Sequence, residues 1–297
     1  MKPALTLAQQ VAQLQNRGMQ ISDVAKAKHY LANISYYRLA GYWWEMQADR
    51  STHSFKPTAK FDQVIRLYTF DRDLKLQLFD AIERLEIALR TKLIYHMSVA
   101  YGPLWYRDPN HFASNHHFNQ TLQKINIDFA ASKEEFVVQH KANNGANHPE
   151  AWKALEVVTL NTISRLYENL KHQLPQKSEI ANEFGLNSHN ILESWLRSIT
   201  YIRNIIAHHS RLWNRVLINR YRWPNSPLSD LLDYKPDNRS MKKLFPILSA
   251  ILYMEKKVSP NNSTKQKLLQ LLNDSPEVPV GKMGFYHNWR NQPIWKD

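Results

Sequence analysis

Apolar side chains recur every three or four residues along most of the chain, which is the spacing of amphipathic helices. The longest such stretch is residues 61–101, where apolar residues keep helical spacing from Phe61 to Leu93 without an intervening proline or glycine. Gly102 and Pro103 follow and predict its end. The pattern therefore predicts one very long helix, or two nearly collinear helices, over residues 61–101.

Shorter helices are predicted on either side of this segment. Thr6 and Gln9 have the spacing of a capping box, which starts a helix near Leu7, and Gly18 marks its end. Further helices are predicted over residues 24–34, 119–140, 151–171, 190–208 and 240–273, the last range holding two. Neither a convincing strand nor an internal repeat is found, so the sequence predicts an all-α fold.

The helical segments are expected to group into three parts. Residues 1–55 form an N-terminal helical module, residues 56–222 a helical core, and residues 223–297 a C-terminal part with a proline-rich linker and helices. The chain ends in an aromatic tail, which we expect to dock on the fold because its side chains are too apolar to stay in water. These side chains include Phe285, Trp289, Ile294 and Trp295.

The composition is that of a folded protein from a reducing compartment. Nine tryptophans, fourteen tyrosines and eleven phenylalanines supply an ample core. Cysteine is absent, which excludes disulfides, thiolate metal sites and cysteine nucleophiles. No apolar run approaches the roughly 20 residues of a membrane-spanning helix, and no signal peptide opens the chain. We therefore expect a cytoplasmic protein that does not bind membranes.

The net charge is +13, and one arginine-rich segment contributes six of these positive charges. Residues 194–229 contain no acidic residue and no lysine, but they contain six arginines and two adjacent histidines. A guanidinium group is always charged and offers a planar fork of donors that suits phosphate. Clustered cations also gain free energy from counterion release on a phosphate backbone. The segment therefore favours a polyanionic partner.

A short motif lies at the centre of this segment. Residues 203–208, RNIIAH, resemble the R-x4-6-H signature of the HEPN ribonucleases. Longer blocks resemble the bacterial abortive-infection Abi-like family, and this resemblance extends from about Leu7 to Trp295. The blocks are SYYRLAGYWW at 35–44, LYTFDRDLKLQLFDAIERLEIALRT at 67–91, YGPLWYRDPNHF at 101–112 and RNIIAHHSRLWNR at 203–215.

The resemblance implies a HEPN-like helical bundle that cleaves RNA without a metal, in an antiphage abortive-infection system. It assigns catalysis to Arg203, Asn204 and His208. His208 can exchange a proton near neutral pH, and Arg203 can stabilise charge on a phosphoryl group. The arginines outside the motif are expected to hold RNA by its phosphates. They are Arg197, Arg211, Arg215, Arg220 and Arg222.

On a helical wheel, Asn204 and His208 share the face opposite the buried isoleucine stripe, whereas His209 lies near that stripe and is interpreted as structural. Arg203 and His208 project in directions about 140° apart. Either the helix ends near Ala207, which frees His208, or a second copy supplies the complementary groups. The HEPN pattern builds its site from two domains, and this chain has one clear motif, so the resemblance implies a homodimer.

A second match, from Arg90 to His96, is interpreted differently. His96 continues the leucine stripe of the long helix and is expected to be buried, while Glu86 and Arg90 have the i,i+4 spacing of an ion pair. We interpret Glu86, Arg90 and His209 as residues that support the site. Metal-binding spacing, a glycine-rich phosphate loop and a serine-nucleophile signature are all absent from the sequence, so neither a metal nor another cofactor is expected.

Two functions remain open at this point. The first is an endoribonuclease effector that cleaves RNA to 2′,3′-cyclic phosphate and 5′-hydroxyl ends. The second is a non-catalytic RNA-binding module that sequesters a structured noncoding RNA, since some relatives are encoded beside a small noncoding RNA that could act as a guard. Only the first predicts that His208→Ala abolishes cleavage while RNA binding stays nearly intact.

Overall fold

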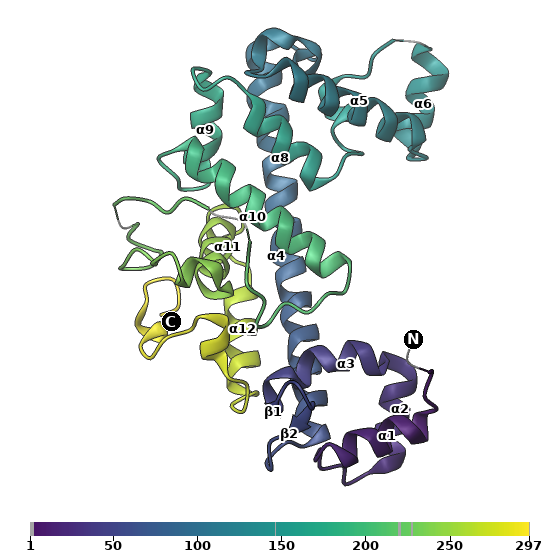
Figure 1. Ribbon diagram of the computed structural model, residues 1–297. Helices are drawn as coiled ribbons and strands as arrows, with labels where there is room; N and C mark the ends of the chain where they lie inside the picture. The colour runs from purple at the N-terminus through teal and green to yellow at the C-terminus, as the bar shows by residue number, and fades with distance from the viewer. Residues whose placement is uncertain (1–2, 146, 219–220, 227, 297) are drawn as a thin grey trace. The chain divides into compact units, whose positions relative to one another are not determined.

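The computed structural model describes residues 3–145, 147–218, 221–226 and 228–296. These residues are mainly helical, which confirms the all-α prediction (Figure 1). The α-helices are α1 (Leu7–Asn16), α2 (Val24–Ile34), α3 (Tyr36–Trp43), α4 (Phe61–Tyr101), α5 (Asn115–Ala131), α6 (Glu135–Asn144), α7 (Ala151–Ala154), α8 (Leu160–Asn169), α9 (Pro175–Glu183), α10 (His189–Ala207), α11 (Leu244–Val258) and α12 (Thr264–Asn273). Short 3-10 helices are η1 (Trp44–Met46), η2 (Trp105–Arg107), η3 (Pro109–His111), η4 (Ser240–Lys242), η5 (Val280–Met283) and η6 (Trp289–Asn291).

Several helix ends differ from the sequence prediction. The long segment is one helix, α4, but residues 119–140 are divided between α5 and α6. The stretch predicted as one helix over residues 151–171 is likewise divided between α7 and α8. Both breaks occur where the apolar spacing continues without a proline or glycine, so periodicity alone does not reveal them.

A small antiparallel hairpin replaces part of the expected connector. Strand β1 (Gln47–Asp49) pairs with β2 (Ser54–Phe55), with Gln47 opposite Phe55. The carboxylate of Asp49 accepts hydrogen bonds from Ser51 and Thr52 in the turn, at 2.8 Å. These bonds, that of the Ser51 backbone foremost, lower the pKa of Asp49 to about 2. The absence of an alternating apolar pattern explains why the sequence did not indicate these strands.

The chain forms two compact units. The first comprises residues 1–76 and 270–278, and in it α1 packs on α2 and α2 packs on α3. A buried hydroxyl, that of Tyr42, donates to Asp71 at 2.7 Å, and Lys75 also lies 3.1 Å from this carboxylate. The Asp71 side chain is fully buried, so these contacts fix α3 against the N-terminal part of α4.

The second unit comprises residues 77–269 and 279–297, and α10 is its central helix. Figure 1 shows α10 beside α8, α9 and α11, and each of these helices packs against it. Trp195, Ile199 and Ile202 are fully buried on its core face. The C-terminal tail is docked on this unit as expected, since the Trp295 indole donates to Ser249 Oγ at 2.9 Å and stacks on Phe245.

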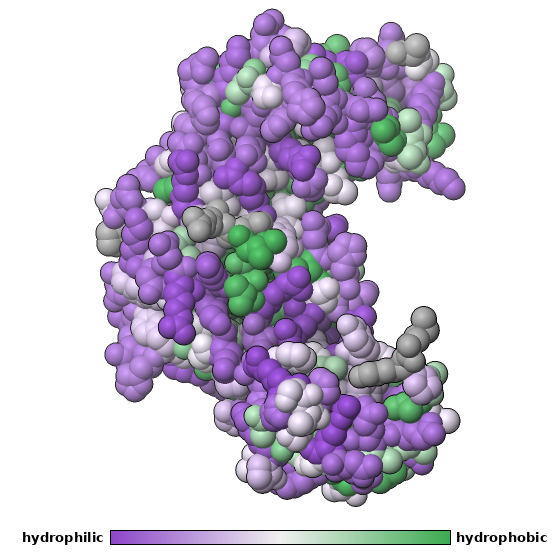
Figure 2. Space-filling view, viewed as in Figure 1, coloured by the Kyte–Doolittle hydropathy of each residue, from purple (hydrophilic) through white to green (hydrophobic). Residues whose placement is uncertain are grey.

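The surface of the described residues is mostly polar. Figure 2 shows hydrophilic side chains over most of the face that it draws. None of the helices in the described ranges combines the length and the apolar character that a membrane crossing requires. The three-part division that the sequence suggests stays a prediction.

Candidate functional site

The RNIIAH motif occupies the last turn of α10. Its isoleucines, Ile205 and Ile206, are buried and hold this turn on the core, while Asn204 and His208 are exposed and Arg203 is half-buried. The helix ends at Ala207, and His208 caps it by donating its backbone N–H to Asn204 O at 3.0 Å. The sequence left two arrangements open, a helix that ends near Ala207 and a second copy that supplies the complementary groups. The structure has the first arrangement, because α10 ends before His208.

His209 adopts a left-handed backbone conformation immediately after the helix. Its φ is 53°, its N–H donates to Ile206 O at 2.9 Å, and the N–H of Ser210 donates to Ile205 O at 2.9 Å. This pair of bonds is a Schellman motif, with histidine in the place that glycine usually takes. The side chain is exposed, so the prediction that His209 faces the core is wrong. A wheel drawn for a continuous helix fails one residue beyond the helix end.

An ion-pair network from α4 lies next to the motif. Arg90 Nη2 lies 2.9 Å from Glu86 Oε1 and donates to Val158 O at 2.9 Å, so the predicted i,i+4 pair forms. Arg90 Nη1 also lies 3.5 Å from Glu156. Burial raises the pKa of Glu86, and the positive charges of Arg90 and Arg203 oppose that increase. Glu86 therefore couples α4 electrostatically to the arginine of the motif.

In the second match to the motif, Arg90 and His96 both form contacts that hold helices together. His96 is partly exposed rather than buried, with 14% of its side chain accessible. Its ring nitrogens lie 2.8 Å from Glu183 and 3.2 Å from Glu179, both on α9. Lys92 forms a further ion pair with Glu183, which holds the carboxylate in place. The leucine stripe did not reveal this contact because α9 lies about 90 residues further along the chain.

A cleft of about 670 Å³ lies between α5, α8 and α10 and reaches the motif at Asn204. Each helix contributes polar side chains to its wall. These include His117 and Thr121 from α5, Ser164 and Arg165 from α8, and Arg197 and Asn204 from α10. Arg197 is exposed and forms an ion pair with Glu168, a residue of the same wall. The cleft therefore brings two of the predicted site residues together on the outward side of α10.

Comparison with known protein families shows the family of this chain. Residues 29–214 match the sequence model of the Abi-like protein family. The chain belongs to this family. The resemblance to the Abi-like family is thus confirmed over residues 29–214, and it supports a role in abortive infection. The matched range includes α10 and the whole RNIIAH motif. Comparisons with curated proteins and with solved structures found no match.

The remaining arginines of this Abi-like protein do not form one cluster. Arg215 lies near the motif, since its Nε donates to Tyr201 Oη at 3.3 Å and its guanidinium group lies 5.9 Å from the centre of that ring. Arg211 is half-buried, and Arg220 lies outside the described residues. The Arg222 N–H instead donates to Ser194 Oγ at 2.9 Å. Arg222 therefore lies beside the first half of α10 and not at the end that carries the motif.

Two histidines and a carboxylate of this Abi-like protein meet near the start of α10. His172 Nδ1 lies 2.9 Å from His189 Nε2, and a carboxylate oxygen of Glu193 lies within 4.8 Å of both. The sequence feature that could have indicated this cluster is the i,i+4 spacing of His189 and Glu193. However, the buried ammonium of Lys177 lies 2.8 Å from Glu193 and neutralises it. An arriving cation would have to displace Lys177, so we interpret the cluster as a hydrogen-bond network.

Proposed function

We propose that this Abi-like protein is a metal-independent endoribonuclease of the HEPN type that acts as the effector of an abortive-infection system. The observation that carries the proposal is the placement of the motif. Arg203, Asn204 and His208 lie at the end of a helix whose core face is buried, and Asn204 lines a cleft that contains further cations. Side chains at such a place can reach a large anionic substrate, while the core beneath keeps the helix end fixed.

The chemistry would be transesterification at a ribose. Neutral His208 removes the proton from the 2′-hydroxyl, the 2′-oxygen bonds to the adjacent phosphorus, and the bond from phosphorus to the 5′-oxygen breaks. The leaving oxygen takes a proton from an acid, and the products are a 2′,3′-cyclic phosphate and a 5′-hydroxyl. Arg203 stabilises the charge that develops on the phosphoryl oxygens. DNA lacks the 2′-hydroxyl, so the activity would be restricted to RNA.

A second copy of the chain would complete the site. α10 ends at Ala207, and one chain presents one copy of the motif at that end. A two-fold interface at this end would bring two motifs together and supply one histidine as base and the other as acid. The homodimer is therefore part of the proposal, and the cleaving species is expected to have twice the mass of the chain.

The test compares His208→Ala with His287→Ala, which removes an exposed histidine of the C-terminal tail. Each purified variant is incubated with end-labelled RNA in EDTA, and the products are analysed for 2′,3′-cyclic phosphate ends. We expect His208→Ala to lower the cleavage rate about 100-fold or more, which is the usual size of a general acid–base contribution. RNA binding should stay near the wild-type level in both variants. Equal cleavage by His208→Ala and His287→Ala would refute the proposal.

The cleft beside the motif supports a second candidate, a non-catalytic module that holds a structured RNA. Its cations, Arg165 and Arg197, could contact phosphates without any help from His208. This function predicts tight, salt-dependent RNA binding by wild-type protein with no cyclic-phosphate product under any condition tested. The same cleavage assay therefore separates the two functions.

A further inference from the structure

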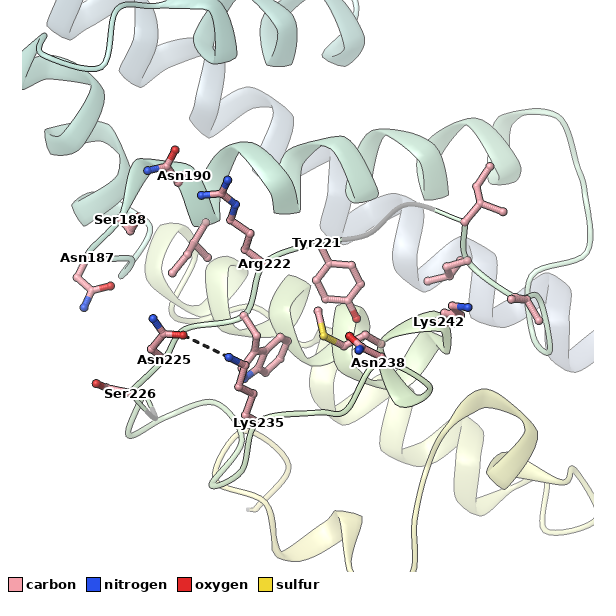
Figure 3. Close-up of a pocket in the computed structure, with 16 residues that line it drawn as sticks. Asn187, Ser188, Asn190, Tyr221, Arg222, Asn225, Ser226, Lys235, Asn238 and Lys242 are labelled. Carbon is pink, nitrogen blue, oxygen red and sulfur yellow. Dashed lines mark hydrogen bonds between the residues drawn. The ribbon is translucent and has the colours of Figure 1, made fainter.

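A second large pocket is lined in part by the first turn of α10 (Figure 3). Its volume is about 970 Å³, and its wall comes from the first turn of α10, from residues 216–218 and 221–226, and from residues that precede α11. A helix of 19 residues is about 28 Å long, so the part of the wall formed by Ser188, Asn190 and Ile191 lies nearly the whole length of α10 from His208. None of the motif residues 203–208 lines the pocket, so it is a different site from the motif.

The pocket wall is basic and rich in amides. Arg222, Lys235 and Lys242 line it, and the lining residues that the structure describes include no aspartate and no glutamate. Amide side chains make up much of the remaining polar wall, among them Asn190, Asn225 and Asn238. Lys235 Nζ donates to Asn225 Oδ1 at 3.2 Å (Figure 3). A wall of cations and amides without carboxylates suits an anion that also carries hydrogen-bonding groups.

Arg222 is held in position by its own backbone. Its N–H donates to Ser194 Oγ at 2.9 Å, and its carbonyl accepts from the Trp195 indole at 2.7 Å. The side chain is exposed, and Figure 3 shows it directed towards Asn190 in the first turn of α10. At this helix start Ser188 makes no side-chain capping hydrogen bond. The arginine and the positive end of the helix dipole therefore act on the same part of the pocket.

Tyr221 supplies an independent observation. Its side chain is only 4% exposed, and its hydroxyl has no hydrogen-bond partner among the described residues. Figure 3 shows that the hydroxyl points to the side of the pocket where Asn238 lies. Burial raises the pKa of this hydroxyl, so it stays protonated and can donate. A buried hydroxyl without a partner is unfavourable unless a ligand supplies the missing hydrogen bond.

We propose that this pocket binds a phosphorylated nucleotide unit, which is either a free nucleoside phosphate or one nucleotide of a single-stranded RNA. Arg222 and the start of α10 bind the phosphate, and the asparagine amides bind the edges of the base or the ribose hydroxyls. The aromatic wall formed by Tyr221 and Trp223 contacts the apolar faces of the ligand. A volume of about 970 Å³ lies within the usual range for such ligands.

The experiment measures binding by isothermal titration calorimetry in the His208→Ala background, so that cleavage cannot change the ligand. The probes are adenosine and uridine 5′-monophosphate, a single-stranded RNA octanucleotide, and inorganic phosphate. Arg222→Gln should weaken nucleotide binding about tenfold, whereas Lys267→Gln, which removes an exposed charge elsewhere in the same unit, should not. Tyr221→Phe should also weaken binding but should not lower the melting temperature, because it removes only a hydroxyl without a partner.

Each outcome decides the proposal. Binding of a monophosphate that Arg222→Gln and Tyr221→Phe both weaken identifies a free nucleotide as a ligand. Binding of the octanucleotide alone, with the same sensitivity, identifies an RNA strand. The proposal is overturned if no probe binds, if inorganic phosphate binds as tightly as the nucleotides, or if Lys267→Gln causes the same loss as Arg222→Gln. Because cleavage is not measured, such a failure would leave the proposed ribonuclease function standing.

Discussion

Lys177 is a completely buried cation whose replacement tests how the helices around α10 are held. Its ammonium group lies 2.8 Å from Glu193 Oε1 on α10 and donates to Glu168 O at 2.8 Å and Leu170 O at 2.6 Å. The two hydrogen bonds to backbone carbonyls and the ion pair with Glu193 join α9 to α10 and to the end of α8. Lys177→Met keeps much of the side-chain volume but leaves the Glu193 charge buried without a partner.

The expected loss is large compared with the stability of a domain. Breaking a buried ion pair by removing one partner costs about 3–5 kcal/mol. At about 2–4 °C per kcal/mol for a unit of this size, the melting temperature should fall by roughly 6–20 °C. The measurement is urea denaturation followed by circular dichroism. Lys133→Met, which replaces an exposed lysine, is the control and should change stability by no more than about 0.5 kcal/mol.

A double variant separates charge from packing. In Lys177→Met/Glu193→Gln the uncompensated charge is gone, and the remaining cost is that of two carbonyls without a donor, about 1 kcal/mol each. The double variant should therefore be more stable than Lys177→Met alone. If Lys177→Met unfolds within about 1 kcal/mol of the wild type, or if Glu193→Gln adds to its loss, the buried pair does not hold these helices.

Three further outcomes are expected. Burial, followed by the charge of Lys177, keeps the pKa of His189 below its ordinary value of 6.5. As the pH falls, the unfolded chain therefore binds a proton at His189 before the folded chain does. Stability should therefore decrease as the pH falls through 6.5, and His189→Gln should reduce that dependence when unfolding is compared at about pH 5.5 and 7.5. Arg84→Met should lower the free energy of unfolding by about 3–5 kcal/mol, because the fully buried carboxylate of Glu255 loses its cation and keeps Thr264 as a hydrogen-bond donor. Thermal unfolding measures this loss. Trp295→Ala should cost about 3–5 kcal/mol and increase proteolysis of the tail, since this indole is 2% exposed.

Periodicity was sufficient to predict the elements whose residues keep one spacing from end to end. The segment of α4 contains 41 residues without a helix breaker, and α10 carries a stripe from Trp195 to Ile206 that can only be a core face. The end of α5 at Ala131 was not predictable in this way. Ser132 turns into an extended conformation, with ψ of 139°, although the apolar spacing continues beyond it. That break depends on tertiary packing, which a local pattern does not contain.

The environment of the site depended on contacts between residues that are far apart in the chain. The Glu86–Arg90 pair was predictable because both residues lie on one helix. In contrast, nothing in the sequence around Lys177 indicates burial, because its carbonyl acceptors and Glu193 come from neighbouring elements. The prediction of the His209 orientation was wrong for a related reason. The chain leaves the helix at Ala207, and beyond that point the direction of a side chain follows from the turn and no longer from the helical wheel.

The distribution of cations along α10 changes how the arginine-rich segment is interpreted. In the sequence its arginines form one cluster, but the chain turns back after the helix, so Arg215 lies beside Tyr201 and Arg222 lies beside Ser194. Fourteen residues of helix separate Ser194 from His208, a distance of about 21 Å. Positive charge therefore extends along the helix and is not focused on the motif. A polyanion that lies along α10 could gain affinity at both ends but would meet His208 at only one. Affinity and cleavage are thus expected to respond to different substitutions, which makes separate binding and cleavage assays necessary for this family member.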